Sequence, residues 1–448
     1  MTLATVPGYD PEGLEPSGGH AVVVGASVAG LLAARVLADG FEEVTVLDRD
    51  SLDDEPTPRP GVPQARQPHV LWEAGRATLE DLFPGYSEEL VAAGGVEIDV
   101  RRDLVQYSQG DFLARCTERF PQYLATRPLY EQLIRRRVAA LEAVRLRPEC
   151  RFTDYVTDDA GATVEGVAVR DRAAGRDELA ADLVVDATGR TSRTPAWLAD
   201  RGYEPPPVDE VRIDVGYAST FVERPAGDRR TVVAPAEAPR TRGGLVTPVE
   251  GGRWLVNVHG VHGDHPPTDP EAFADFAASL AVPQPKRVLD DHPRVGDVES
   301  YPFPSNRRNR YEDLRRFPAG LVVVGDAIAS FNPIYGQGMS VAALEALLLH
   351  RALATGGREE LPLRFFDGAA DVVDVAWTMA VGADFGFPET QGPKPRGTAF
   401  SSWYLGRLLR GAHADGALTD AFVRVLAMQE PPSSLLRPNV AWRVLKPV

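Results

Sequence analysis

The sequence predicts an α/β protein in which short buried strands and helices alternate with longer, half-buried strands. Two apolar runs, Ala21–Val24 and Leu321–Val324, have the length of strands that are buried in a parallel sheet. Between about Tyr203 and Tyr301, apolar and polar residues alternate, as they do in antiparallel strands. Residues 361–448 have mostly helical spacing. A chain of 448 residues is too long to fold around one simple hydrophobic core, so we expect two or three intertwined subdomains.

Residues 20–48 predict a Rossmann-type unit, which is a strand, a glycine-rich turn, a helix and a second strand. Apolar residues with strand or helix spacing carry this prediction. They are Val22, Val23 and Val24 for the first strand, Leu31, Leu32, Val36 and Leu37 for the helix, and Val44, Val46 and Leu47 for the second strand. Such a unit places free backbone N–H groups at the start of its helix.

Further along the chain, the same periodicities predict elements of both kinds. The expected helices are His69–Leu82, Arg127–Ala143 and Gly338–Leu353. The expected strands are the hairpin Leu104–Tyr107 and Phe112–Cys116, then Thr163–Arg170, Asp182–Val185, Val211–Phe221, Thr231–Ala234, Gly244–Val249 and Trp254–Val258. The last four are the candidate for an antiparallel, substrate-binding sheet.

Charge and composition exclude several classes of function. The net charge is −16, which argues against nucleic acid and anionic membrane surfaces as partners. Cys116 and Cys150 are too few for a disulfide framework, so we expect a reducing, cytoplasmic setting. Residues 1–19 lack the pattern of a signal peptide, and no run approaches the roughly 20 apolar residues of a membrane span. We therefore expect no integral membrane segment.

Three histidines, His259, His262 and His265, have a spacing that suggests a metal cluster. They lie in a segment rich in Gly, Pro and Asp, which favours a solvated turn. We therefore expect no metal site.

The turn after the first strand has the features of a dinucleotide site. Gly25 allows the tight turn that ends the strand, and Gly30 allows close packing of the helix. Ser27 stands where the usual motif has its second glycine. Asp48 ends the next strand, where an acidic residue can accept hydrogen bonds from a ribose, and Arg49 follows it. An ordinary strand–helix turn is the alternative interpretation.

Three later segments indicate that the dinucleotide carries a flavin. An Asp at the end of a strand suits the hydroxyls of a polyol chain. A Pro/Gly turn that leads to a new helix N-terminus suits a polarised ring attached to that chain. The residues are Asp186 and Gly189 in the first segment, Gly325 and Asp326 in the second, and Pro333, Gly336, Gln337, Gly338 and Met339 in the third. We expect Asp326 to bind ribityl hydroxyls and the helix N-terminus to favour negative charge on the ring.

These segments resemble those of the class A flavoprotein monooxygenases, which have the hydroxybenzoate hydroxylase fold. The resemblance runs from about residue 20 to 355 and implies FAD as the cofactor. It implies that Asp186–Gly189 lies beside the cofactor, that Gly325-Asp326 meets its ribityl chain, and that Arg127 touches the flavin. No second glycine-rich turn is present. This family needs none, because its reductant NAD(P)H docks transiently.

Together, the periodicities and the resemblance predict a Rossmann-type FAD-binding domain interleaved with a mostly antiparallel substrate domain and followed by helices. The expected segments are a flexible tail (1–18), a first FAD-binding segment (19–102), a substrate-domain hairpin (103–125), a second FAD-binding segment (126–202), a substrate-binding β-sheet domain (203–304), a third FAD-binding segment (305–356) and a helical C-terminal region (357–448).

The resemblance also implies a reaction. In this family, reduced flavin captures O2 as a C4a-hydroperoxide, which transfers one oxygen atom. The segment Pro60–His69 resembles that of bacterial epoxidases of polyketide polyenes, which are relatives of squalene monooxygenase. Arg66, Gln67 and His69 are expected at the flavin edge, and they equally suit a role in anchoring the following helix. We predict epoxidation of an alkene in a lipophilic polyketide or terpenoid-like intermediate, with His69 and Tyr335 as candidate catalytic residues.

Other reactions remain open from the sequence alone. An aromatic hydroxylase of a polyketide or phenol benefits from a base that deprotonates the phenol. A flavin-dependent dehydrogenase or double-bond reductase transfers hydride without O2, and a non-catalytic flavin-binding protein is a further alternative. A halogenase needs a lysine in the first third of the chain, but none precedes Lys286. Apolar alternation at Val211, Ile213 and Val215 fits either a lipophilic substrate or ordinary sheet packing. The oligomeric state is not predicted.

Overall fold

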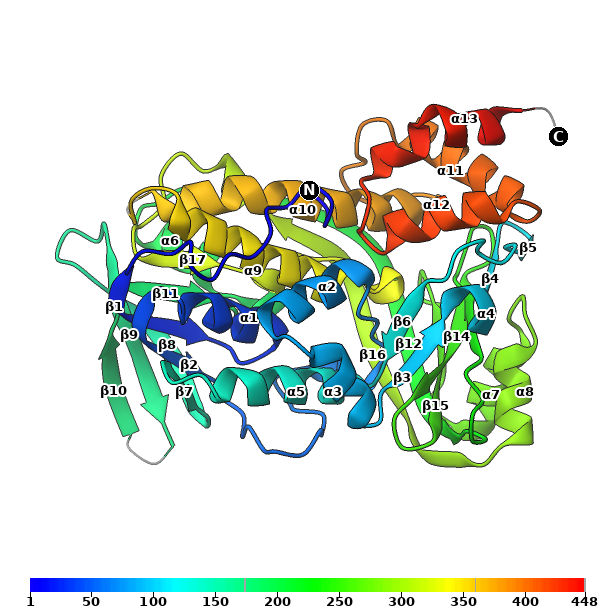
Figure 1. Cartoon of the computed structure of the whole chain (residues 1–448), viewed down its shortest axis with the longest axis horizontal. Coiled ribbons are helices and arrows are strands. Elements are labelled where there is room, and N and C mark those ends of the chain that lie inside the picture. Colours follow the sequence, from blue (N-terminus) through cyan, green and yellow to red (C-terminus); the bar gives the residue numbers. More distant parts are fainter. Residues whose placement is uncertain (173–174, 359, 447–448) are drawn as a thin grey trace.

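A five-stranded parallel sheet forms the centre of the larger part of the molecule (Figure 1). This computed structural model describes residues 1–172, 175–358 and 360–446. The strands are, in spatial order, β17 (Leu321–Val323), β11 (Leu183–Asp186), β1 (Gly18–Val24), β2 (Phe41–Leu47) and β7 (Val144–Arg147). Every adjacent pair is parallel, so the carboxyl ends of all five strands meet at one edge of the sheet.

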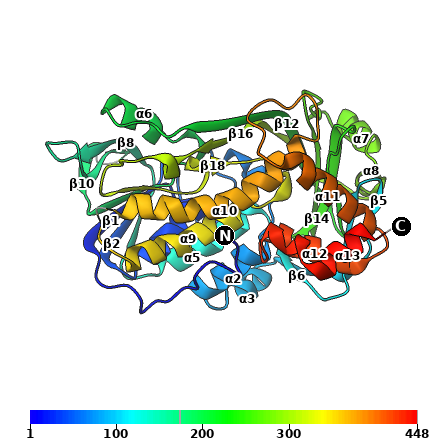
Figure 2. The same cartoon turned by 90° about the horizontal axis from the view of Figure 1, so that it is seen from above.

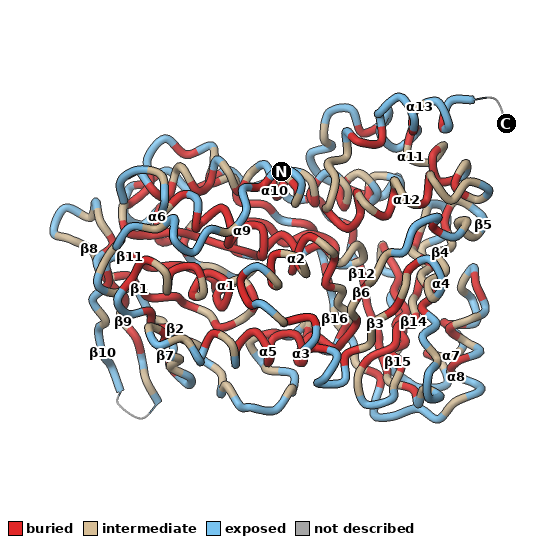
Figure 3. The backbone as a smooth tube through the Cα atoms, in the orientation of Figure 1, coloured by how far each residue is buried: buried red, intermediate tan, exposed pale blue. Residues whose placement is uncertain are grey.

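Helices pack over this sheet in layers. α1 (Val28–Leu37) packs against α9 (Gly338–Ala354), and α9 also contacts α10 (Leu361–Asp384) and α2 (Glu73–Leu82), as Figures 1 and 2 show. α5 (Arg127–Ala139) lies along α1. Most residues of α1 and α9 are buried, and the tube in Figure 3 shows this continuous buried core. Burial of these Leu, Val and Ala side chains is the main stabilising contribution of the domain.

The second large element is an eight-stranded sheet, which is antiparallel apart from one pair. Its strands are, in spatial order, β18 (Ala329–Ser330), β16 (Arg294–Asn309), β12 (Val208–Glu223), β15 (Arg253–Gly260), β14 (Arg242–Val249), β13 (Thr231–Ala234), β4 (Leu104–Ser108) and β5 (Asp111–Phe112). Only the pair of β13 and β4 is parallel among the described strands of this sheet. The expected α/β fold with a mostly antiparallel second sheet is therefore confirmed.

Smaller elements complete the two domains. The strands are β3 (Val96–Asp99), which pairs with β6 (Pro121–Leu124), and the antiparallel set β8 (Cys150–Thr157), β9 (Val164–Asp171) and β10 (Gly175–Ala180). The helices are α3 (Tyr86–Ala92), α4 (Val100–Asp103), α6 (Thr194–Asp200), α7 (Pro270–Ala278) and α8 (Gln284–Asp291). α8 packs on β14 and β15.

The C-terminal region is helical, as expected, and lies at the end of the molecule that holds the larger sheet (Figure 1). Beyond α10 it consists of α11 (Thr398–Ala412), α12 (Gly416–Leu426) and α13 (Pro438–Leu445), which share an apolar cluster with Trp72, Val100 and Cys116. None of the helices in the described ranges is both long and apolar enough to cross a bilayer.

The first residues of the chain, for which we expected a flexible tail, lie against the body of the protein. Thr2 is fully buried, and Val6 belongs to the main core. The backbone N–H groups of Leu3 and Ala4 donate to the carbonyls of Met428 and Gln429, at 3.0 and 3.1 Å. The start of the chain is therefore tied to the residues that follow α12.

Some boundaries differ from those that the sequence predicts. The helix expected from His69 begins at Glu73, because Leu71 pairs with Tyr123 in an antiparallel bridge and holds the preceding residues extended. The second strand of the hairpin ends at Phe112 instead of Cys116. The helix that starts at Arg127 ends at Ala139, four residues before the expected end.

Candidate active site

A cavity of about 820 Å³ runs along the carboxyl edge of the parallel sheet. Its lining comes from β1, β2 and β11, from the loops that follow β17, and from α1, α5 and α9. Open α/β sheets bind their ligands at this edge, because strand ends and helix N-termini converge there. The cavity therefore defines the candidate active site.

Two glycines shape the turn between β1 and α1. Gly25 has a φ of +112°, and a Cβ atom there would lie 2.5 Å from the carbonyl oxygen of Ala187. A Cβ atom on Gly30 would lie only 1.8 Å from the carbonyl oxygen of Gly25. Both positions therefore require glycine, and α1 begins directly at the cavity wall with its N–H groups free.

Ser27, which replaces a glycine of the usual motif, belongs to a buried ionic network. Nη2 of Arg127 donates to Ser27 Oγ at 2.7 Å, and Ser27 Oγ donates to Glu131 Oε2 at 3.1 Å. Arg59 donates to Glu131 Oε1 from Nε at 3.0 Å and from Nη2 at 2.5 Å. Our sequence analysis missed Arg59 and Glu131. Glu131 stands one helical turn after Arg127, which is the only local signal that pointed to it.

Asp48 lines the cavity at the end of β2, but its carboxylate also holds the turn. Oδ2 accepts from the backbone N–H of Ala26 at 2.8 Å, and Arg59 Nη1 lies 3.2 Å from Oδ1. The predicted ribose contact remains a prediction. Arg49, the next residue, is exposed at the cavity mouth.

Asp186 closes the turn that follows β11. Its carboxylate accepts hydrogen bonds from Thr188 N at 2.9 Å, from Thr188 Oγ1 at 2.6 Å, and from the hydroxyls of Ser192 and Thr194. These bonds show that Asp186 orders the turn and leaves Gly189, with a φ of +76°, at the cavity wall.

Arg190 is a cavity residue that our sequence analysis did not single out. Its guanidinium donates to Ser305 Oγ at 2.9 Å and to Ser330 Oγ at 3.2 Å, and it lies 5.2 Å from the centre of the Phe303 ring. Arg190 therefore joins the FAD-binding turn to the large sheet. No spacing in the sequence predicts this contact, because the partners are more than 100 residues away.

The Gly325-Asp326 segment lines the cavity, into which the Asp326 side chain is exposed. Gly325 has a φ of +67°, and a Cβ atom there would lie 2.7 Å from Ala29 Cβ. The Asp326 carboxylate opens into the cavity, where burial inside the protein raises its pKa and the charges of Arg127 and Arg190 oppose that rise. A carboxylate placed here can accept hydrogen bonds from hydroxyls of a ligand.

The third predicted segment forms the far end of the cavity. Pro333, Gly336, Gly338 and Met339 line it. Gly338 faces open space, since a Cβ atom there would meet nothing within 4 Å. Gly336 differs from our expectation, because a Cβ atom there would lie 2.1 Å from Val70 Cγ1. Its glycine is therefore required by packing on the protein and by a φ of +66°.

Three predicted site residues point elsewhere. The Gln337 side chain is buried and donates to the carbonyl of Leu426 at 3.1 Å, so it faces the C-terminal helices. Arg66 is exposed and pairs with Glu299 at 2.9 Å. Tyr335, in a 3₁₀ turn, is absent from the described cavity lining. Each of these residues belongs to a segment that reaches the cavity, but its own side chain is absent from the described lining.

His69 lines the cavity, whereas Gln67 anchors its segment to the large sheet. The Nδ1 of His69 lies 2.9 Å from the carbonyl oxygen of Gln67, and burial together with the charge of Arg127 lowers the pKa of His69 to about 3. Gln67 accepts from Ser219 Oγ at 2.7 Å and donates to the carbonyl of Glu299 at 3.0 Å. His69 is therefore neutral at physiological pH.

The solvated turn that we expected for three histidines is wrong for His259, which lies buried within β15, whereas His262 and His265 follow that strand. His259 is buried, and its ring nitrogens lie near Asn257 Oδ1 and the N–H of Ala236, at 3.2 and 3.3 Å. His265 pairs with Asp214 at 3.1 Å. In the described ranges, no group of three or more His, Cys, Asp or Glu side chains could hold a metal ion.

The glycine turn, the helix N-terminus and Asp326 along one elongated cavity define a flavoprotein with the class A monooxygenase fold. Residues 20–367 match the family model described as FAD binding domain. The chain belongs to that family, and it is an FAD-dependent enzyme of the monooxygenase type.

Individual proteins are similar to this chain over most of its length. The protein Rv3254 of Mycobacterium tuberculosis (strain ATCC 25618 / H37Rv) is 35% identical to this chain over 429 residues, which cover 90% of this chain and 88% of that protein. Two solved structures share the fold. The flavin-dependent brominase Bmp2 has a TM-score of 0.65 and 17% identity, with 95% of this chain and 98% of that chain covered. The oxygenase of 2-methyl-3-hydroxypyridine-5-carboxylic acid has a TM-score of 0.61 and 18% identity, with 89% of this chain and 96% of that chain covered.

Proposed function

We propose that this enzyme uses FAD, NAD(P)H and O2 to epoxidise an alkene of a lipophilic, polyketide or terpenoid-like intermediate. The observation that carries this proposal is the state of His69. With a pKa of about 3 it is a weak base, and its Nδ1 faces a backbone carbonyl instead of a carboxylate or a phenol. Phenol hydroxylation benefits from a base, whereas alkene epoxidation needs none.

The cavity fits FAD on three observations. It is elongated and begins at the N-terminus of α1, which suits a pyrophosphate. Arg127 Nε is buried and has no hydrogen-bond partner among the described residues, so it is available to an anion in the cavity. The open space at Gly338 lies beside the N-terminus of α9, which suits a polarised ring.

When bound, FAD supplies the redox chemistry that activates O2. The turn from Gly25 and the guanidinium of Arg127 would hold its pyrophosphate, and Asp326 would accept bonds from its ribityl hydroxyls. Pro333 and Gly338 would contact its ring. The protein itself then has three tasks. It binds FAD, orients the substrate and excludes water.

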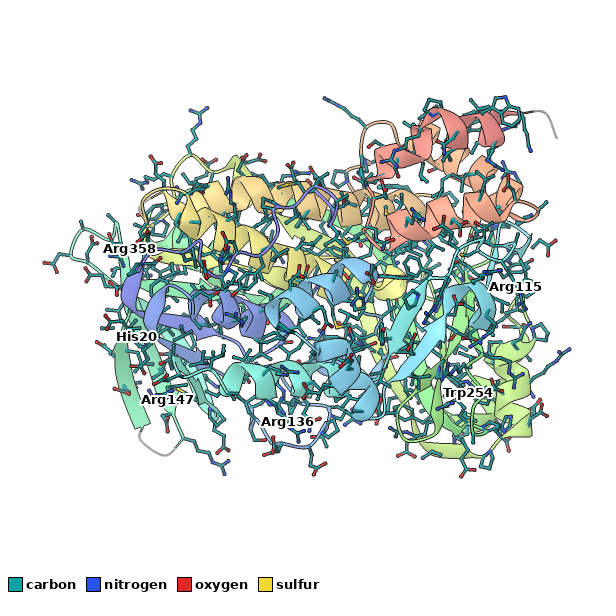
Figure 4. The ribbon with its side chains drawn as sticks, in the orientation of Figure 1. His20, Arg115, Arg136, Arg147, Trp254 and Arg358 are labelled. Carbon is teal, nitrogen blue, oxygen red and sulfur yellow. The ribbon has the colours of Figure 1, made fainter. Side chains whose placement is uncertain are left out.

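Arginines at the cavity mouth support NAD(P)H as the reductant. Arg147 and Arg358, labelled in Figure 4, are not part of this group, since they are absent from the described cavity lining and pair with Asp171 and Asp182, both at 2.9 Å. Arg49, Arg151 and Arg193 line the cavity and are exposed, and they form no salt bridge with any described residue. In a protein with a net charge of −16, three such cations form a local site for phosphate groups.

The shape of the lining supports a lipophilic substrate. Tyr301, Phe303 and Phe331 line the cavity, and Phe303 and Tyr301 continue into a small apolar cluster that contains Val215. Aromatic hydroxylation of a polyketide or phenol is the second candidate, since the same aromatic wall would also hold a flat ring. A dehydrogenase or double-bond reductase is the third.

One experiment tests these candidates together. Purified protein is expected to be yellow and to release FAD on denaturation, and recovery of FMN or no flavin would contradict the cofactor assignment. The enzyme is then given NAD(P)H, isotopically labelled O2 and a panel of polyenes and phenols. An epoxide with one labelled oxygen atom supports the proposal. A labelled phenol favours the hydroxylase, and a reduced, unlabelled product favours the reductase.

The role of His69 is tested in the same assay. His69→Ala is expected to lower the coupling of NAD(P)H use to product by about 10-fold to 100-fold, which is the scale of lost positioning. Tyr335→Phe, outside the described cavity lining, should have a smaller effect. Abolished turnover in His69→Ala, with FAD binding and flavin reduction intact, would indicate acid–base catalysis instead.

A further inference from the structure

A buried carboxylate lies where charge is unfavourable, at the last residue of α10. Asp384 is 3% exposed and faces the negative end of the dipole of a 24-residue helix. It contacts the segment Asn332–Met339, which we call the flavin loop. Asp384 Oδ1 accepts from Asn332 Nδ2 at 2.9 Å, and Oδ2 accepts from Asn306 Nδ2 at 2.7 Å. A charge kept in such a position is better explained by a role in the site than by stability.

The two amides can face Asp384 only with their NH2 groups. Asn306 Oδ1 accepts from the backbone N–H of Asn332 at 2.6 Å. Asn332 Oδ1 accepts from the N–H of Ile334 at 3.3 Å and from the Tyr217 hydroxyl at 2.6 Å. A backbone N–H is always a donor, so it fixes the oxygen of each amide and turns both NH2 groups towards Asp384. Two facing donors need two acceptors, which a carboxylate provides and a neutral amide does not.

We propose that Asp384 is a positioning residue that holds the flavin loop in its FAD-binding conformation. Asn332 immediately precedes Pro333, which lines the cavity. The network joins the loop to β12 through Tyr217, to β16 through Asn306, and to α10 through Asp384 itself. This inference rests on the proposed function in one respect only, namely that the loop contacts the flavin.

The network also predicts a dependence of FAD binding on pH. Burial raises the pKa of Asp384 to about 6, and the bonds from both amides oppose that rise. Below this pH the carboxyl carries a proton that faces an NH2 group, so one acceptor is lost. Burial raises the pKa of the nearby phenols of Tyr217 and Tyr335, which therefore stay neutral. A further titratable neighbour is His262, which lies 3.3 Å from the hydroxyl of Thr390, itself bonded to the Asp384 carbonyl.

The first test measures the FAD dissociation constant of the full-length protein by flavin fluorescence, at pH 8 and pH 5.5. Asp384→Asn is expected to weaken FAD binding by about 10-fold to 100-fold at pH 8, which is the scale of an unpaired buried donor. Asp367→Asn, at an exposed position of the same helix, is the matched control and should bind as the wild type does. The acid-induced weakening of the wild type should be smaller in Asp384→Asn, whereas any contribution of His262, or of Asp326 and Glu345 around Gly325, would persist in it.

The second test is a rescue. Asn332→Asp alone places two carboxylates against each other and should also weaken FAD binding. The double variant Asp384→Asn/Asn332→Asp restores one acceptor for every donor, because the amide at 384 then donates to the carboxylate at 332. It should bind FAD more tightly than either single variant. This recovery is not expected from residues that only fill space.

The outcomes separate the two proposals. Wild-type affinity in Asp384→Asn, or a double variant no better than the weaker single variant, overturns the role of Asp384 and leaves the proposed function standing. A wild-type protein that binds no FAD at any pH overturns the proposed function itself. Should Asp384→Asn fail to fold, the double variant decides, since recovery of both folding and FAD binding supports the network and failure of both overturns it.

Discussion

The two ends of the cavity are built in opposite ways. The turn end, which is the segment Val24–Gly30, belongs to one continuous strand, turn and helix. The ring end, which is the flavin loop, is held by Trp72, Asn306 and Asp384, from three distant elements. The comparison teaches that the backbone of the turn end is a local structure, whereas the ring end exists only after long-range packing. Changes at the two ends should therefore have different consequences.

The largest effect is expected at the turn end, from Gly30→Ala. The added Cβ atom would lie 1.8 Å from the Gly25 carbonyl oxygen, so α1 must move away from β1. We expect no stable FAD-containing protein, as judged by thermal unfolding and flavin content. Gly382→Ala is the control, since a Cβ atom there meets nothing within 4 Å, and helix propensity favours Ala by about 0.5–1 kcal/mol. A yellow, wild-type-like Gly30→Ala protein would show that the turn is not as rigid as its geometry indicates.

The next largest effect is expected from Arg127, which bonds to Ser27 in the turn and lines the cavity. Arg127→Ala removes the guanidinium bonded to Ser27 and leaves Glu131 paired with Arg59. We expect FAD affinity to fall by about 10-fold to 100-fold, because a hydrogen bond to a charged group contributes roughly 1.5–3 kcal/mol. Arg136→Ala, an exposed arginine of the same helix, should leave the dissociation constant unchanged. Equal affinities of the two variants would remove Arg127 from the phosphate site.

The same comparison explains what the sequence could and could not predict. Gly25 and Gly30 were predictable because the positive φ of Gly25 and the approach of Gly30 to the Gly25 carbonyl act within a few residues, although Gly25 also packs on the distant Ala187. Arg59, Arg190 and Asp384 have no local signature, since their partners lie up to 140 residues away in the chain. Such pairs can be recognised only in the folded structure, where the two sheets bring the partners together.

Side-chain direction was the second limit on prediction. The motif that contains Tyr335, Gln337 and Gly338 contributes Gly338 to the described cavity lining, yet Gln337 bonds to Leu426 and Tyr335 is absent from that lining. A 3₁₀ turn from Pro333 to Tyr335 changes the direction of successive side chains. Spacing along the sequence does not fix which of them enters the cavity. The fold class, which depends on periodicity over whole segments, was less sensitive to such local turns.

A smaller effect is expected from paired substitutions at the ring end. In Gly336→Ala, the Cβ atom would lie 2.1 Å from Val70 Cγ1 and the backbone φ of +66° would be strained. We expect this variant to lose about 1–3 kcal/mol of stability and part of its FAD affinity. In Gly338→Ala, the Cβ atom projects into open space, so folding should be unchanged and only flavin binding should respond. Urea unfolding and FAD titration of both proteins test this difference, which would be refuted by equal losses of stability.

The last effect concerns Glu345, a buried residue of α9 that bonds to Gly325 in the cavity wall. Its Oε2 accepts from the N–H of Gly325 at 2.7 Å, and its Oε1 has no hydrogen-bond partner among the described residues. Burial raises the pKa of Glu345 from 4.5 to about 8, while the bond from Gly325 lowers it and the charge of Asp326 raises it further. The folded protein therefore binds a proton that the unfolded chain releases between about pH 4.5 and pH 8.

The sign of this shift means that the stability contributed by Glu345 is fully present below about pH 4.5 and is lost as the pH rises through about 8. The slope for one proton is at most about 1.4 kcal/mol per pH unit. Glu345→Gln keeps an acceptor for Gly325 and has no proton to lose, so it should match the wild type at pH 5 and be more stable at pH 9. Glu42→Gln, on an exposed position of β2, should follow the wild type throughout. Urea midpoints across this range measure the difference, and parallel pH profiles of wild type and Glu345→Gln would mean that Glu345 is ionised inside the fold and that its unpartnered oxygen is solvated.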